Sequence, residues 1–126
     1  MTRREKIKAA LMNMGVDPSL TGFEYLVEAV DIQIENKMNK KRWNAIETYA
    51  NIGLSYNTSG GCVERAIRHA IEKAFDTNEG LIYDVFTPFI CYYRRKVGNS
   101  TFISVMAERI MMGKFVFMEV VENDFT

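Results

Sequence analysis

Charged side chains with the chemistry to read DNA bases stand close together in the segment 60–77. Glu64, Arg65, Arg68 and His69 fall on one side of a helix, within its first three turns. A guanidinium group makes two-point contacts with guanine, and a carboxylate accepts a hydrogen bond from cytosine. Residues of these types on one exposed helix face therefore predict recognition of base edges in a DNA major groove.

The same residues also fit a simpler interpretation, the solvated face of an amphipathic helix. Glu64 and Arg68 are four residues apart, a spacing at which an intrahelical ion pair contributes about 0.2–0.5 kcal/mol. His69 has the chemistry of an acid–base group, but a surface or phosphate-contacting role fits its place in the pattern better. Periodicity by itself leaves the DNA-reading and solvated interpretations open.

The helix that carries these residues has the clearest apolar pattern in the chain. Its stripe repeats at helical spacing without a miss and comprises Val63, Ala66, Ile67, Ala70, Ile71, Ala74 and Phe75. Thr58 or Ser59 can cap its first turn, whereas Gly60 and Gly61 in that turn each cost up to about 1 kcal/mol relative to alanine. The face opposite the stripe is centred near Arg65 and should be exposed.

The remaining helices follow from apolar spacing and from stop signals. We predict them over about 3–14, ended by Gly15; over about 19–36; from Trp43 to Ile52, with a break at Gly53; from about 80, mostly buried and kinked or restarted at Pro88; and from a cap at Asn99 or Ser100 to a stop at Gly113. The fold class is therefore all-α with about six helices. A helix before the turn at Asn57 and Thr58, followed by the helix from 60, is the order of a helix-turn-helix.

Nothing in the sequence divides the chain into parts. There is no repeat, low-complexity stretch or linker, so we expect residues 1–126 to form one domain, with 114–126 as an added C-terminal tail that is extended in part. The apolar run 115–121 either packs back on the domain or pairs with a partner chain. We expect packing.

Composition and charge exclude several functions. A chain of 126 residues with 48% hydrophobic and 25% charged residues suits a single packed core, and no apolar run is long enough for a secretory or membrane segment. We therefore expect a cytoplasmic protein that does not contact a membrane. The net charge of zero argues against indiscriminate binding of polyanions, although the basic stretches 40–42 and 94–96 remain as candidates for phosphate contacts.

Motifs for enzyme chemistry are missing from the sequence. It has no phosphate loop, paired-carboxylate motif or nucleophile elbow, so we expect no catalysis, no cofactor and no small-molecule substrate. Cys62 and Cys91 do not form a metal-binding pair, and His69 is the single histidine, so we expect no metal. A cysteine in the first turn of a helix could be a nucleophile or redox sensor, but no base is placed to help Cys62, and we interpret it as structural or incidental.

A run of ten residues in this helix resembles a known protein family. Residues 63–72, VERAIRHAIE, closely resemble the recognition helix in the DNA-binding effector domain of the sporulation initiation (stage zero) response regulator of endospore-forming bacteria. Other stretches on both sides of this string resemble the family in the same order along the chain. They are Gly15-Val16, residues 22–26, Tyr56-Asn57-Thr58, Gly98-Asn99-Ser100 and Phe102-Ile103. The resemblance covers roughly residues 5–114. It implies six helices, a helix-turn-helix, and binding to a short asymmetric DNA box, often as tandem head-to-tail copies.

The resemblance also implies roles for single residues. Glu64 and Arg65 correspond to positions that read bases, and Arg68 and His69 to positions that hold the phosphate backbone. Cys62 stands where the family has a base-contacting arginine, so the loss of one bidentate contact, about 1–3 kcal/mol of discrimination, is implied there. The family's proteins carry an N-terminal receiver domain that controls dimerisation, and we expect this chain to act without one.

Our leading hypothesis from the sequence is a sequence-selective transcriptional regulator that binds double-stranded DNA. We predict base contacts by Glu64, Arg65 and Cys62. We predict backbone contacts by Arg68 and His69 and, at the start of the helix, by Thr58 and Ser59. Homodimers or tandem copies on DNA are compatible with this hypothesis. The alternative is a protein-interaction or accessory module that retains the fold without specific DNA binding.

Overall fold

The computed structural model describes residues 1–78, 80–90 and 97–115, and its regular structure is helical throughout those ranges. In chain order the elements are α1 (Arg3–Asn13), α2 (Thr21–Met38), α3 (Ala45–Ser55), α4 (Gly60–Thr77), α5 (Leu81–Phe86), the short 3-10 helix η1 (Thr87–Phe89) and α6 (Asn99–Met111). The prediction of an all-α fold with six helices is confirmed. Of the apolar run 115–121 only Phe115 is described, partly buried against the core; residues 116–121 and the basic stretch 94–96 lie outside the described residues.

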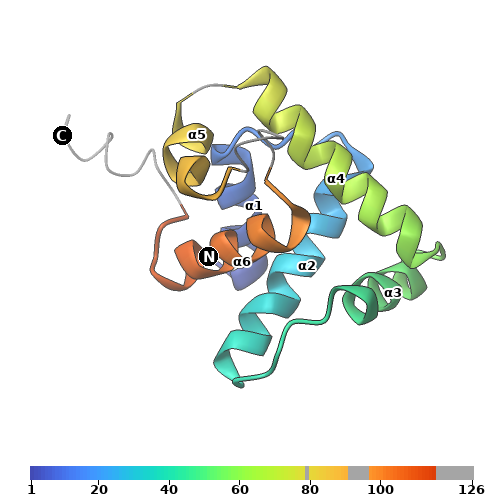
Figure 1. Ribbon diagram of the computed structural model, residues 1–126. Coiled ribbons are helices and arrows are strands. Elements are labelled where there is room, and N and C mark those ends of the chain that lie inside the picture. The colour runs from blue at the N-terminus through green and yellow to red at the C-terminus, as the bar shows by residue number, and fades with distance from the viewer. Residues whose placement is uncertain (79, 91–96, 116–126) are drawn as a thin grey trace.

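Helix α2 lies at the centre of the bundle. It packs against α1, α3, α4 and α6, and Figure 1 shows α5 and α6 on one side of it with α3 and α4 on the other. The core between these helices is fully apolar at its centre, where Leu11, Leu26, Ile67 and Phe102 are all buried. The ring of Phe102 also stacks on that of Phe86, with 4.8 Å between ring centroids, so α5 and α6 share the core.

The approach of α2 to α4 depends on Gly22. A Cβ atom at this position would be 2.7 Å from the backbone carbon of Ala66 and closer still to its carbonyl oxygen. Real Cβ atoms do not come this near to backbone, so only glycine lets the two helices cross at this distance. The buried stripe of α4 is thereby pressed directly onto the central helix.

Most predicted helix limits differ from the observed ones by one or two residues. Gly15 and Gly113 adopt the left-handed conformation, with φ of 87° and 82°, and so end α1 and α6 as predicted. The predicted break at Gly53 is wrong, because α3 continues to Ser55. Around Pro88 the helix restarts as predicted, with α5 ending at Phe86 and η1 following.

Two other expectations are corrected by the described residues. The segment from 80 was expected to be mostly buried, but only Ile82 and Phe86 are buried in α5, while Tyr83 and Phe89 are exposed. The predicted cap of the last helix is also wrong. Its N-cap is Gly98, with no side-chain hydrogen bond. The side chain of Asn99 donates to α4 instead, and that of Ser100 accepts from Trp43 in the link between α2 and α3.

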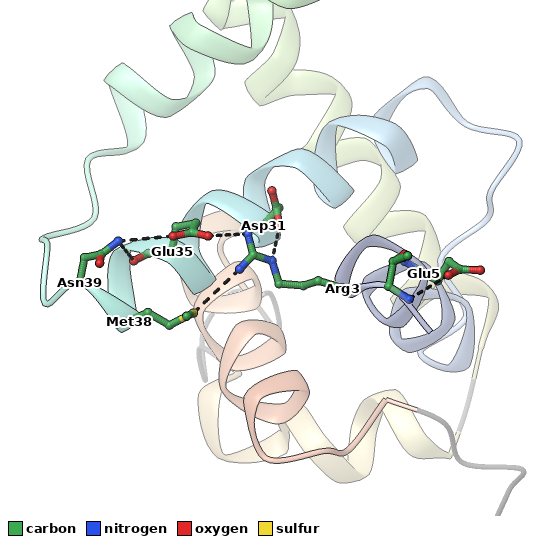
Figure 2. Close-up of polar contacts among 7 residues, drawn as sticks. Arg3, Glu5, Asp31, Glu35, Met38 and Asn39 are labelled. Carbon is green, nitrogen blue, oxygen red and sulfur yellow. Dashed lines mark hydrogen bonds and ion pairs between the residues drawn. The ribbon is translucent and has the colours of Figure 1, made fainter.

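The basic N-terminus is paired with the acidic side of α2. Arg3 donates through Nε to Asp31 at 2.7 Å and through Nη2 to Glu35 at 2.7 Å, as Figure 2 shows. Arg4 pairs with Glu28 at 2.8 Å. These hydrogen bonds raise the pKa of both arginines, the bond to Glu35 being the largest cause for Arg3 and the bond to Glu28 for Arg4. The cluster joins α1 to α2, and the charges of both arginines are paired with acidic side chains.

None of the helices within the described ranges has the length and apolar character needed to cross a bilayer.

Candidate nucleic-acid interface

The candidate interface is built on α3 and α4, which pack against each other and are joined by residues 56–59. Asn57 turns the chain with a positive φ of 56°, and the backbone N–H of Thr58 donates to the carbonyl of Gly53 at 2.8 Å. A Cβ on Gly53 would be 2.6 Å from the carbonyl oxygen of Thr58. The turn passes so close to α3 that only glycine fits at position 53 inside the helix.

The start of α4 is fixed by a local cap. Ser59 is the N-cap, and its Oγ accepts a hydrogen bond from the backbone N–H of Cys62 at 3.1 Å. Such a cap contributes about 1 kcal/mol and so offsets part of the cost of the two glycines that follow. The prediction of a cap at Thr58 or Ser59 is confirmed at Ser59.

Helix α4 has one buried face and one exposed face. Its buried residues are Val63, Ile67, Ala70, Ile71, Ala74 and Phe75, which is the predicted apolar stripe with one exception, since Ala66 is only partly buried. On the other face Arg65, Arg68 and His69 are exposed. Figure 1 shows α4 along the outer edge of the bundle. The cationic side chains that the sequence singled out are thus directed away from the core.

Glu64 and Arg68 form an ion pair on this face. Nη1 of Arg68 lies 2.8 Å from both carboxylate oxygens of Glu64. The two side chains are 33% and 50% exposed, so water screens the pair and its contribution stays at a few tenths of a kcal/mol. Contacts of that size are easily exchanged for contacts to a ligand.

Cys62 and Arg65 lie next to each other at the start of the face. Nη2 of Arg65 is 3.4 Å from Sγ of Cys62. The pKa of the Cys62 thiol is lowered, first by a hydrogen bond with Ser59, then by one with Thr58, and also by the charge of Arg65. The structure thus brings together all three residues predicted as base contacts, Glu64, Arg65 and Cys62, within the first two turns of α4.

A group of polar residues behind this face was not predicted from the sequence. Asn99 donates through Nδ2 to the backbone carbonyl of Glu64 at 3.1 Å, and Nε1 of Trp43 donates to Oγ of Ser100 at 2.9 Å. Burial raises the pKa of Tyr49, hydrogen bonds with Asn99 and Ser100 lower it, and the charge of Glu64 raises it. These effects place the Tyr49 hydroxyl among the same residues.

A pocket of about 580 Å³ opens beside this group and is lined by α3, α4 and the start of α6. In the sequence, only the glycine–asparagine–serine stretch at 98–100 pointed to this pocket, and that stretch is also typical of a helix cap. The single tryptophan carried no signal of its own.

The link between α2 and α3 adds positive charge near the interface. Lys40, Lys41 and Arg42 are exposed, and Lys40 adopts a positive φ of 55°. Arg42 and Lys41 line a small pocket together with residues at the start of α3. Lys37, by contrast, forms an ion pair with Glu108 of α6, with 3.1 Å between Nζ and Oε1.

An all-helical bundle in which a short turn joins two packed helices, the second with a cationic outer face, has the architecture of a helical DNA-binding protein. The family model described as "Sporulation initiation factor Spo0A C terminal" matches residues 7–110. The chain belongs to this family. Its members are DNA-binding effector domains of a transcriptional regulator and are not enzymes. The resemblance noted over roughly residues 5–114 is thus confirmed over residues 7–110.

Proposed function

We propose that this chain is a transcriptional regulator that binds a specific double-stranded DNA sequence through the exposed face of α4. The observation that carries the proposal is the exposure of Arg65, Arg68 and His69 on the helix that follows the α3–α4 turn. In helix-turn-helix proteins the second helix enters the major groove and its first turns contact the bases. The α3–α4 pair has the order and packing which that mode of binding requires.

In the proposed complex the residues divide into two groups. Arg65 and Glu64 read base edges, because a guanidinium donates to guanine and a carboxylate accepts from cytosine. Cys62 lies beside them and offers only the weak hydrogen bonding of a thiol. Discrimination therefore rests mainly on Arg65 and Glu64.

The second group of residues holds the phosphate backbone. Arg68 and His69 lie one turn further along the same face, and Thr58 and Ser59 lie at its start. Ser59 already accepts a hydrogen bond from the Cys62 backbone, but its hydroxyl keeps a proton to donate to a phosphate. Lys41 and Arg42 are further candidates for backbone contacts, since both are exposed near the start of α3.

The wider proposal follows from the family. The described helices act as one DNA-binding unit within residues 1–126. The protein acts in the cytoplasm, where the DNA is. Copies of it bind in tandem on adjacent DNA boxes. Sedimentation of the protein on duplexes with one or two boxes measures the number of copies bound.

Selection of duplexes from a randomised pool tests the proposal most directly. The selected duplex and a scrambled duplex of the same composition are then titrated at two salt concentrations. A regulator prefers the selected duplex and binds both more weakly at high salt, because phosphate neutralisation releases counterions. Equal and negligible binding to both duplexes would contradict the proposal and favour the alternative, a protein-interaction module with the same fold.

A further inference from the structure

The start of α6 contacts each part of the proposed DNA-binding unit. Asn99 reaches α4 at the Glu64 carbonyl, with 3.1 Å between the atoms. Ser100 accepts a hydrogen bond from Trp43, in the link that contains the exposed basic residues 40–42. Trp43 in turn packs edge to face on Tyr49 of α3. Two adjacent residues thus connect the basic link, the first helix of the pair and the second.

The bond from Asn99 is separate from the hydrogen bonds within α4. In an α-helix the carbonyl of residue 64 accepts from the N–H of residue 68, and its second lone pair is free for another donor. Asn99 supplies that donor from a different helix. Because Glu64 lies in the second turn of α4, the bond holds the turns that carry Cys62, Glu64 and Arg65.

We propose that Asn99 is a positioning residue for sequence discrimination, which fixes the first turns of α4 relative to the rest of the unit without touching DNA itself. The inference rests on the proposed function. Contacts to base edges depend on small displacements of the reading helix, whereas contacts to phosphates tolerate them, because charge attraction varies slowly with distance. Loss of Asn99 should therefore reduce discrimination and leave the salt dependence of binding unchanged.

The chain provides a matched control at the other end of α4. Asn78 also donates through Nδ2 to an α4 carbonyl, that of Ala74 at 2.9 Å, and to the carbonyl of Gly15 at 3.0 Å. Like Asn99, it is a half-buried asparagine that ties α4 to another segment. The two carbonyls on α4 are ten residues apart, about 15 Å along the helix, so the Asn78 bonds do not hold the reading turns.

The experiment compares Asn99→Ala with Asn78→Ala. Each variant is titrated against the duplex selected by the wild-type protein and against its scrambled counterpart, at two salt concentrations, and its urea midpoint is measured. For Asn99→Ala we expect the ratio of the two dissociation constants to fall by about fivefold, the equivalent of one neutral hydrogen bond, with an unchanged salt slope. Asn78→Ala should lose at least as much stability and keep the wild-type ratio.

Three outcomes overturn the inference. Asn99→Ala could keep the full ratio, Asn78→Ala could lose as much as Asn99→Ala, or both dissociation constants of Asn99→Ala could rise equally. Failure of the proposed function itself looks different, since the wild-type protein would then show no preference for any duplex. Hydrogen exchange adds a readout without DNA. Asn99→Ala should speed exchange at the amides of residues 65–69 and leave 74–77 unchanged.

Discussion

Arg68 holds Glu64 through both carboxylate oxygens, each 2.8 Å from the same guanidinium nitrogen. The pair joins a proposed backbone contact to a proposed base contact, and because it is exposed and weak it is readily exchanged for contacts to DNA. Only Arg68 carries positive charge, so substitution of Arg68 should change the salt dependence of DNA binding in a way that substitution of Glu64 does not.

For Arg68→Ala we expect weaker binding to every duplex and little change in preference. Removing one phosphate contact should lower the slope of log affinity against log salt by about 1. The free energy of unfolding should change by less than about 0.5 kcal/mol, because the lost ion pair is exposed. Titration of selected and scrambled duplexes measures the first effect and urea unfolding the second. A loss confined to the selected duplex would mean that Arg68 reads bases.

Arg65 should show the opposite behaviour. Arg65→Lys keeps the charge but loses the planar fork that makes two-point contacts. We therefore expect it to bind the scrambled duplex as the wild type does while losing about 1–3 kcal/mol on the selected duplex. Competition titration of both duplexes at one salt concentration checks this. If the variant and the wild type bound the selected duplex equally, Arg65 would not contact the bases.

Cys62→Arg introduces the residue type that the resemblance implies for this position. Cys62 is exposed, so the longer side chain has room, and the fold should be unaffected. We expect tighter binding, a salt slope steeper by about 1, and a changed preference at one base pair worth about 1–3 kcal/mol. Repeating the selection with the variant shows which base pair changes. An identical selected sequence and affinity would indicate that this position faces away from DNA.

The Cys62 thiol should react at lower pH than an ordinary exposed thiol. Its pKa is lowered, chiefly by the hydrogen bond with Ser59, so the reactive thiolate forms earlier as pH rises. The rate of alkylation by iodoacetamide against pH, followed by mass spectrometry on the Cys62 peptide, measures the shift and keeps Cys91 separate. In Ser59→Ala the profile should move back towards higher pH. Identical profiles for the two proteins would argue against this cause.

Gly22→Ala should destabilise the protein strongly. The added Cβ meets the backbone of Ala66, which cannot rotate away, and overpacking of this kind costs about 1–3 kcal/mol or more. Gly61→Ala is the matched control, because its Cβ meets only side-chain ends, Nη1 of Arg65 at 3.4 Å and Oγ of Ser59 at 3.9 Å. Helix propensity should then stabilise it by up to about 1 kcal/mol. Urea unfolding of both variants decides the matter, and a Gly22→Ala as stable as wild type would contradict the close crossing.

The sequence predicts best what depends on local pattern. The apolar stripe of α4 repeats from Val63 to Phe75, through more than three turns. A pattern that long determines both the helix and its exposed side, which is why the exposure of Arg65 and Arg68 could be foreseen. Gly53 shows the limit. Glycine is needed there because a Cβ would meet the carbonyl of Thr58 in the following turn, and a local interpretation sees only a helix-breaking residue.

Contacts between segments far apart in the sequence explain the wrong cap predicted for the last helix. Asn99 and Ser100 have the composition of a helix cap, but their donors and acceptors meet Glu64 and Trp43, which are 35 and 57 residues away in the chain. A side chain that can bond locally or at long range gives the same signal in the sequence. The pairing of Arg3 with Asp31 and Glu35 has the same character, since it depends on how α1 lies on α2.

Those arginine pairs have a consequence for how the protein meets a polyanion. Arg3 and Arg4 are paired on α2, and Arg68 is paired with Glu64. Among the described residues, the cationic side chains that form no ion pair include those of the link at 40–42 and Arg65 of α4. A molecule of zero formal charge can then behave as an oriented dipole, turned by the field of a duplex before contact. Salt should therefore slow its association by weakening that alignment, even though no overall attraction exists to be screened.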